Sequence, residues 1–381
     1  MSILPLHASA SLAGLLVGCA LGQSESPQPF PVSDSAVPDA LDTPVDGPPE
    51  LGRVRFGRDL AAALAASRAD GRPVFVLFQE IPGCSTCRDF GAGPLSQPRL
   101  VEAIETLFHP VVVRNNAGGE DARILQAYRE PSWNNPVARF FDAAGADQIP
   151  RRDRVWSTSA IAERLAEALV AARRDVPPWL ELVPLETARQ TQSVTLAMHC
   201  FWEGEARLGA LPGVVDGEAG FQDGREVVRV EFDPTRTERA ELLAGARERS
   251  CADAVFVERS DDATRARANE LGIPVRERQE PGRAAGADDH RRRLRRSALG
   301  WLPLGRTQAT RIESALAAGE DGQRWLSPRQ LALLGQVRRA IAADASALNV
   351  LPRPNEPRDL ALAEERLAAS LDALLARGEF E

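Results

Sequence analysis

The 381-residue sequence contains no lysine and a single tyrosine, Tyr128. All 46 basic residues are therefore arginines, and with 54 acidic residues the formal net charge is −8. A chain with this acidic surplus has no excess positive charge to neutralise a phosphate backbone, so it is not predicted to bind nucleic acid. The arginine-rich run from His290 to Arg296 is accordingly interpreted as a solvated helix face rather than a polyanion site.

The amino-terminal apolar stretch, Leu12 to Leu21, is too short for a transmembrane helix, which needs about 20 residues. It has the length of a signal-peptide core. Its segment Leu-Val-Gly-Cys resembles the lipobox of bacterial lipoproteins, which implies a lipid on Cys19. Cleavage after Gly22 or an unprocessed tail are the alternatives. We therefore expect a signal peptide over 1–22, export to the periplasmic side of a bacterial membrane, and membrane contact only through a lipid anchor.

Residues 23–50 are rich in Pro, Ser and Asp and predict a disordered linker. Export also changes how the five cysteines are interpreted, because thiols in an oxidising compartment tend to form disulfides. A pair spaced as Cys-x-x-Cys in such a compartment is typical of proteins that exchange disulfides.

Such a pair stands at Cys84 and Cys87, in the sequence Ile-Pro-Gly-Cys-Ser-Thr-Cys. The apolar run Pro73 to Gln79 before it predicts a buried strand, and a helix is predicted to follow. A thiol at the start of a helix faces unpaired N–H groups and the positive end of the helix dipole, which favour the thiolate. Cys84 is therefore predicted to attack and Cys87 to resolve. A structural or metal-binding pair is the alternative, although zinc needs four ligands and His109 is the only histidine nearby.

The pattern around this dithiol is helix, strand, motif, helix, strand, helix, strand, helix. Over residues 51–176 it resembles the thioredoxin fold, and the Ile-Pro-Gly before Cys84 resembles the Val-Pro-Gly of a bacterial thioredoxin-like (seleno)protein group. The resemblance implies a cis-proline that shapes the substrate groove, placed here at Pro136. It also implies exchange with protein thiols and disulfides, with no cofactor and no metal.

Residues 190–305 follow a β-α-β-β-α-β pattern, the order of ferredoxin-like α+β folds. The sequence Cys-Phe-Trp-Glu-Gly-Glu at the first strand-to-helix junction, followed by LPGVV and EVVRVEFDP, resembles peptide methionine sulfoxide reductase of the A type. The resemblance implies that Cys200 is the nucleophile and Glu205 the acid. It places Phe201 and Trp202 in the pocket that grips the substrate methyl group.

This segment departs from the family at several positions. Phe221 stands where the family has its first active-site tyrosine, and the segments that carry the family's second tyrosine and an aspartate have no counterpart. Two or three hydrogen-bond donors to the sulfoxide oxygen are therefore missing. Cys251 is a candidate resolving thiol for the sulfenic acid that the reaction leaves, and a buried structural cysteine is the alternative. His199 and Glu203, beside Cys200, are a candidate acid/base pair. Residues adjacent in a strand point to opposite faces, which favours a His199 without a catalytic role.

Residues 306–381 show helical spacing throughout and are predicted to pack on the second domain, with Ser327 and Pro328 starting one helix. The predicted fold is an α/β thioredoxin fold, then an α+β ferredoxin-like domain and a helical carboxy-terminal region. The functional hypothesis is an exported thiol-disulfide oxidoreductase that draws electrons from an envelope donor and is coupled to repair of methionine-sulfoxide-containing proteins. The alternative is a non-catalytic envelope scaffold with degenerate redox modules.

Overall fold

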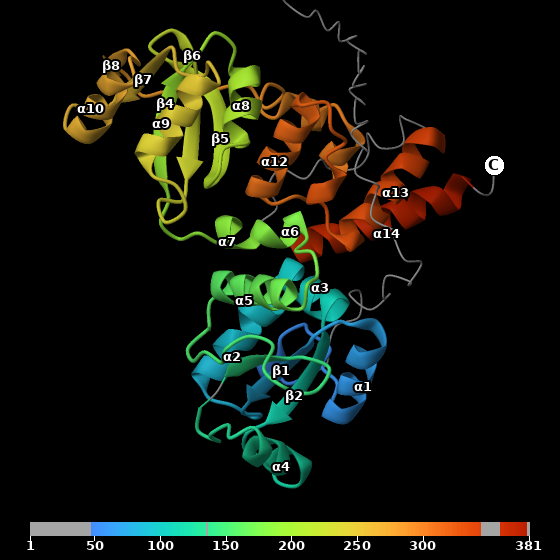
Figure 1. Ribbon diagram of the computed structural model, residues 1–381. Coiled ribbons are helices and arrows are strands. Elements are labelled where there is room, and N and C mark those ends of the chain that lie inside the picture. The colour runs from blue at the N-terminus through green and yellow to red at the C-terminus, as the bar shows by residue number, and fades with distance from the viewer. Residues whose placement is uncertain (1–46, 135, 344–358, 379–381) are drawn as a thin grey trace, which may run out of the picture. The chain divides into compact units, whose positions relative to one another are not determined.

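The structure is a computed structural model in which residues 47–134, 136–343 and 359–378 are described. The expected signal peptide, Cys19 and most of the expected 23–50 linker lie outside the described residues. The described part is a mixed α/β protein with one three-stranded and one six-stranded sheet (Figure 1). Within these ranges no helix combines the length and the apolar character that crossing a membrane requires.

The first sheet has the strand order β2-β1-β3, in which β1 runs parallel to β2 and antiparallel to β3. The elements of this segment are η2 (Pro49–Leu51), α1 (Leu60–Asp70), β1 (Val74–Gln79), α2 (Ser85–Ala92), η3 (Pro94–Ser96), α3 (Pro98–Leu107), β2 (His109–Arg114), α4 (Glu120–Ala127), β3 (Val137–Phe141) and α5 (Thr158–Ala171). The predicted helices and strands of this segment are present. The structure adds one helix to the prediction: both α2 and α3 lie between Cys84 and β2. The helical conformation is interrupted between them at Gly93 and Pro94.

Strand β1 is buried on both faces, as its continuous apolar run predicts. Phe75 and Leu77 face a core shared with α3 and α5, and the alternate residues of the strand face a second core shared with α1 and α4. The expected linker after α5 contains two short helices, α6 (Pro178–Glu181) and α7 (Val183–Glu186). It is ordered because Trp179 and Leu180 pack into the first of these cores.

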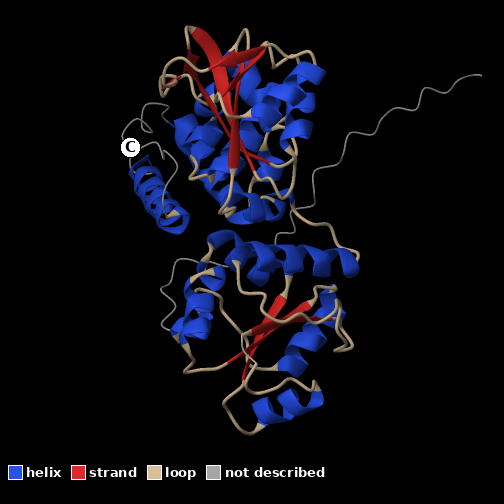
Figure 2. Cartoon of the chain, turned by 90° about the vertical axis from the view of Figure 1, so that its left-hand side faces the viewer, coloured by secondary structure: helices blue, strands red, loops and turns tan. Residues whose placement is uncertain are grey.

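The second sheet has the strand order β8-β7-β4-β6-β5-β9. Its segment contains β4 (Gln192–Ala197), α8 (Phe201–Gly209), β5 (Val214–Gln222), β6 (Arg225–Phe232), α9 (Arg239–Glu248), β7 (Ala254–Val257), α10 (Asp262–Glu270), β8 (Val275–Glu277), β9 (Arg283–Ala284) and α11 (Arg292–Arg295). The order from β4 to β7 is the predicted β-α-β-β-α-β. Leu196, Val228 and Val230 on one sheet face share a core with Leu208 of α8 and Leu243 of α9. Figure 2 shows the strands in red with the helices packed against them.

The remaining described elements are η4 (Ala298–Trp301), α12 (Arg306–Ala317), η5 (Gln323–Trp325), α13 (Pro328–Ala343) and α14 (Leu360–Gly378). Helix α12 packs on α8 and β5, as the prediction for the tail requires. Helix α13 begins at Pro328, and the Ser327 hydroxyl accepts a hydrogen bond from the Gln330 N–H (3.4 Å), which confirms the predicted start of this helix.

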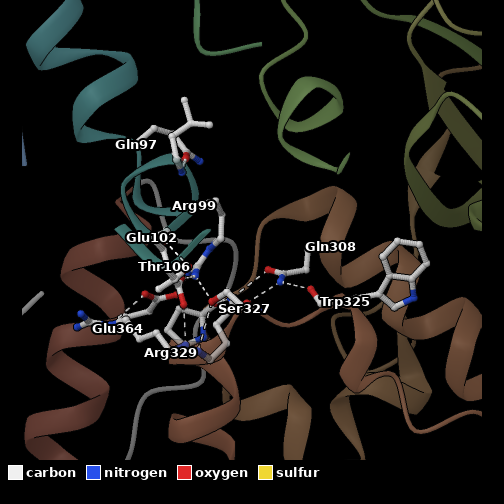
Figure 3. A network of polar contacts seen from close by, with 12 residues as sticks. Gln97, Arg99, Glu102, Thr106, Gln308, Trp325, Ser327, Arg329 and Glu364 are labelled. Atoms are coloured by element: carbon white, nitrogen blue, oxygen red, sulfur yellow. Dashed lines mark hydrogen bonds and ion pairs between the residues drawn. The ribbon is translucent and has the colours of Figure 1, made fainter. Parts of the chain in front are cut away.

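A buried ionic cluster joins α3 to α13 and α14, a contact that the sequence did not predict (Figure 3). The Arg99 guanidinium of α3 donates to Glu102 at 2.7 Å and also to Glu364 and Ser327. The Arg329 main-chain N–H donates to Glu102 at 2.7 Å, and its side chain lies 3.4 Å from Glu364. Because these charges are removed from water, each depends on its partners for compensation.

Candidate active site

The two thiols of the dithiol differ in exposure. Cys84 is exposed at the N-cap of α2, whereas Cys87 is buried in the first turn of that helix. Their sulfur atoms lie 3.6 Å apart. Hydrogen bonds from the main-chain N–H and the thiol of Cys87 lower the pKa of Cys84, and the N–H of Thr86 adds to this effect. Burial, reinforced by the contact with Cys84, raises the pKa of Cys87 to about 12. The exposed thiol of the pair, Cys84, therefore has the lower pKa of the two.

Gly83 and Glu50 contact the segment that carries the dithiol. A Cβ at Gly83 would lie 2.4 Å from the carbonyl oxygen of Glu80 and 2.7 Å from Cβ of Cys87, so only glycine fits without displacement. The Gly83 N–H donates to the Glu50 carboxylate at 2.8 Å, and Glu50 is 2% exposed. The Gln79 amide donates to the carbonyl oxygens of Glu50 (2.7 Å) and Cys87 (3.2 Å). Glu50, which the sequence placed at the end of the expected linker, thus belongs to the dithiol environment.

Pro136 lies at the same end of the sheet as the dithiol. It directly precedes β3, whose first residue, Val137, pairs with Phe78 near the end of β1. Its carbonyl oxygen accepts a hydrogen bond from the Trp156 indole N–H at 3.1 Å. The peptide bond before Pro136 involves Asn135, which is outside the described residues, so its predicted cis geometry stays a prediction.

Glu80 joins the two thiols as a third group whose ligand atoms all lie within 4.8 Å of one another. A structural zinc site needs four ligands, and these three residues do not complete that set. His109 does not supply the fourth. It pairs with Val74 at the start of β1, whereas the dithiol follows the end of that strand.

A second cluster of side chains lies next to Cys200 and is built around Phe201. This half-buried cysteine is the N-cap of α8, and the next residue, Phe201, donates its main-chain N–H to the Glu226 carboxylate at 2.8 Å. The Phe201 ring lies edge-on to the rings of Trp202 and Phe221, with centroid separations of 5.6 Å in both cases. Phe221 pairs with Glu226 across the β5–β6 hairpin. Phe201, the residue directly after Cys200, therefore contacts two other aromatic rings and one carboxylate.

Glu205, the acid expected from the family resemblance, faces a different part of the fold. It is 2% exposed, and its carboxylate lies 2.5 Å from Nδ1 of His290 and accepts the Arg291 main-chain N–H at 2.8 Å. These contacts anchor the chain just before α11. The carboxylate beside the first turn of α8 is Glu226, which the sequence analysis missed. A signal was present, since Glu226 is the one acidic residue on a strand face that continues with Val228 and Val230.

Cys251 is buried and lies three residues before the start of β7. Strands β4 and β7 are antiparallel, with Ala197 paired to Ala254 at their end. Cys200 follows Ala197 by three residues and Cys251 precedes Ala254 by three, so both cysteines leave the sheet at the same end. Burial raises the pKa of the Cys251 thiol, and the described cysteines, including these two, are thiols rather than disulfides.

His199 and Glu203 are not brought together as an acid/base pair by any described contact. His199 is exposed, and the Glu203 carboxylate forms ion pairs with Arg293 and Arg207 instead. Glu203 therefore links α8 to α11.

Comparison with known proteins finds similarity to a curated protein and to solved structures. No family model matches the chain. The peptide methionine sulfoxide reductase MsrA 2 of Rhizobium meliloti (strain 1021) is 36% identical over 77 residues, which cover 16% of this chain and 38% of that protein. The chain thus spans well under half the length of this relative. A solved structure described as DsbH Oxidoreductase matches with 20% identity and a TM-score of 0.27, over 31% of this chain and 85% of that chain.

Proposed function

We propose that this chain is a thiol-disulfide oxidoreductase whose reactive groups are Cys84 and Cys87. The observation that carries the proposal is the difference between two sulfur atoms 3.6 Å apart, one exposed with a lowered pKa and one buried with a pKa of about 12. This difference supports a mechanism in which Cys84 attacks and Cys87 resolves. Pro136, at the same end of the sheet, would shape the groove that receives the client.

The reaction proceeds by two exchanges. The Cys84 thiolate attacks one sulfur of a client disulfide, forming a mixed disulfide and releasing the other client sulfur as a thiolate. Cys87 then loses its proton and attacks the Cys84 sulfur. The second client thiolate leaves, and the Cys84–Cys87 disulfide remains. Two electrons pass to the client, and an external donor in the envelope restores the dithiol.

An insulin-reduction assay with dithiothreitol tests this proposal on the full chain. We expect the wild type to accelerate precipitation of the insulin B chain, Cys84→Ser to abolish the acceleration, and Cys87→Ser to accumulate a mixed disulfide visible by mass spectrometry. Cys251→Ser is the matched control, since it removes a buried thiol elsewhere in the chain. A wild-type rate equal to dithiothreitol alone would overturn the proposal and favour a non-catalytic envelope scaffold.

We propose a second activity, reduction of peptide methionine sulfoxide at Cys200, because Cys200 lies with aromatic rings and the Glu226 carboxyl group in one cluster. The Cys200 thiolate attacks the sulfoxide sulfur while the acid protonates the oxygen, which yields methionine and a sulfenic acid on Cys200. Phe201 and Trp202 would hold the substrate methyl group. In this proposal Glu226 takes the role of the acid and Glu205 that of a structural anchor.

The oxidised Cys200 needs a second thiol. Cys251 would condense with the sulfenic acid, releasing water and forming a Cys200–Cys251 disulfide. A dithiol then reduces this disulfide, and the Cys84–Cys87 pair on the same chain offers one at high effective concentration.

Mass spectrometry of a methionine-sulfoxide peptide incubated with the full chain and dithiothreitol tests the second activity. We expect conversion to methionine by the wild type and none by Cys200→Ser. Equal conversion by both proteins would overturn a role for Cys200.

We also propose that the chain is exported and held at a bacterial membrane by a lipid on Cys19. The support is the short apolar segment that contains Leu-Val-Gly-Cys. Metabolic labelling with a palmitate analogue in a bacterial host should mark the wild type and not Cys19→Ala. Labelling of both would contradict this attachment site.

A further inference from the structure

Two arginines stack on the aromatic rings of the Cys200 cluster. The guanidinium carbon of Arg292, in α11, lies 3.9 Å from the centroid of the Trp202 ring. That of Arg283, in β9, lies 4.5 Å from the centroid of the Phe221 ring. Cation–π contacts at these distances hold each guanidinium over a fixed ring face.

The pairing of three strands explains why Arg283 reaches this cluster. Arg283 pairs with Phe221 between β9 and β5, and Phe221 pairs with Glu226 between β5 and β6. Residues that pair in this way project from the same face of the sheet, so the three side chains form one row. The row ends at the carboxylate that accepts the Phe201 N–H beside Cys200.

These two guanidinium groups carry charge that no carboxylate within the described ranges neutralises. Neighbouring arginines differ: Arg291 forms an ion pair with Asp216, and Arg293 forms ion pairs with Glu203 and Glu313. Among the residues that the structure describes, the side chains of Arg283 and Arg292 make neither an ion pair nor a hydrogen bond. Two held and uncompensated positive charges therefore flank the aromatic rings at Cys200.

We propose that Arg283 and Arg292 select methionine sulfoxide in acidic peptide segments, with Asp or Glu on either side of the oxidised residue. This inference rests on the proposed sulfoxide reduction at Cys200. A guanidinium donates two parallel N–H groups to a carboxylate, and stacking on a ring fixes its orientation before the client arrives. The same charges disfavour clients with Arg or Lys beside the sulfoxide, so the pair contributes discrimination as well as affinity.

Three peptides of equal length test the inference, each with a central methionine sulfoxide flanked by Asp, Asn or Arg. We expect the full chain to give the highest kcat/KM with the Asp peptide, through a lower KM at similar kcat. Arg292→Gln and Arg283→Gln should each lower kcat/KM for the Asp peptide by about fivefold, the size of an exposed charge pair, and leave the Asn peptide unchanged. Arg292→Lys should restore part of the preference. Added salt should reduce it.

Arg276→Gln is the matched control, because Arg276 is exposed on β8 and contacts neither ring. Equal kcat/KM for the three peptides, or a loss in Arg276→Gln as large as in Arg292→Gln, would overturn the inference. An absence of turnover with every peptide would instead overturn sulfoxide reduction. Fluorescence anisotropy then measures binding of the labelled peptides to Cys200→Ser, which tests the preference for acidic segments without turnover. Tighter binding of the Asp peptide that is lost in Arg292→Gln supports it, and equal binding of all three overturns it.

Discussion

The Glu226 carboxylate accepts a hydrogen bond of 2.8 Å from the main-chain N–H of Phe201, the residue directly after Cys200. This contact satisfies one of the N–H groups that the first turn of α8 leaves without a helical partner. It also fixes an ionisable carboxyl group beside the candidate nucleophile. Glu226 therefore caps the first turn of α8 next to Cys200, and in the proposed sulfoxide reduction it is the acid.

Substitutions of Glu226 and Glu205 test which of the two is the proton donor and which is the structural anchor. Glu226→Gln keeps a hydrogen-bond acceptor for the Phe201 N–H but removes the acid, so we expect kcat for methionine sulfoxide reduction to fall about 10²-fold or more. Glu205→Gln should instead lower the urea midpoint of unfolding, because Glu205 contacts His290 and the N–H of Arg291. If Glu205→Gln alone abolished turnover and Glu226→Gln did not, the two assignments would be reversed.

The reactivity of Cys84 should depend on pH with a low midpoint. The hydrogen bonds that stabilise its thiolate lower its pKa, so the thiolate persists below the pH at which a free cysteine is protonated. The rate of iodoacetamide alkylation should rise with pH and reach half its maximum below about 8.5, the value for an unperturbed thiol. Peptide mapping should find Cys84 labelled and Cys87 unmodified. A midpoint at or above that of free cysteine would show that the helix end does not activate Cys84.

The space at Gly83 predicts a strong effect of one methyl group. Gly83→Ala places a Cβ 2.4 Å from a fixed carbonyl oxygen, so the loop before Cys84 must shift. Displacement of reacting groups by about 1 Å can cost 10²-fold in rate, and we expect a loss of that order in insulin reduction. Gly118→Ala is the control, because a Cβ there meets nothing within 4 Å. Equal activity of the two variants would mean that the loop adapts without cost.

Cys251 should determine what becomes of an oxidised Cys200. After one turnover without reductant, we expect the wild type to contain a Cys200–Cys251 disulfide that does not react with dimedone. Cys251→Ser should leave a sulfenic acid on Cys200, which dimedone labels. Dimedone labelling of the wild type and the variant to the same extent would assign resolution to another thiol.

The buried ionic cluster predicts that replacing one charged partner lowers the free energy of unfolding more than replacing two partners together. Arg99→Met leaves Glu102 and Glu364 with less compensation, and we expect it to lower the free energy of unfolding by about 3 to 5 kcal/mol. The double variant Arg99→Met with Glu364→Leu should recover part of this loss, as urea denaturation would show. An additive loss in the double variant would mean that the two side chains do not compensate each other.

The sequence predicted the elements that depend on local patterns. The apolar run of β1, the dithiol at the start of α2 and the Ser327–Pro328 helix start each follow from residues close together in the chain, and the structure confirms them. The β-α-β-β-α-β order from β4 to β7 was likewise present in the alternation of apolar residues.

Contacts between distant residues were not predicted. Glu226 lies 25 residues after Phe201, and only the pairing of β4 with β6 brings it to Cys200. Arg283 reaches the same cluster through a two-residue strand, which is too short to produce an alternation of apolar and polar residues in the sequence. The Arg99 cluster joins residues more than 200 positions apart, and charged residues in a sequence give no sign of which of them will be buried.

The position of Glu50 has a practical consequence for anyone who divides this chain into fragments. The hydrophobic pattern suggests a cut at residue 51, which would discard a carboxylate that holds the Gly83 N–H. It would also remove Pro49, whose carbonyl oxygen lies so close to Gly91 of α2 that a Cβ there would be 2.0 Å away. A fragment that starts at residue 51 would therefore carry both cysteines but lack the contacts of Pro49 and Glu50 with the dithiol segment. Recombinant versions of this segment should begin before Pro48.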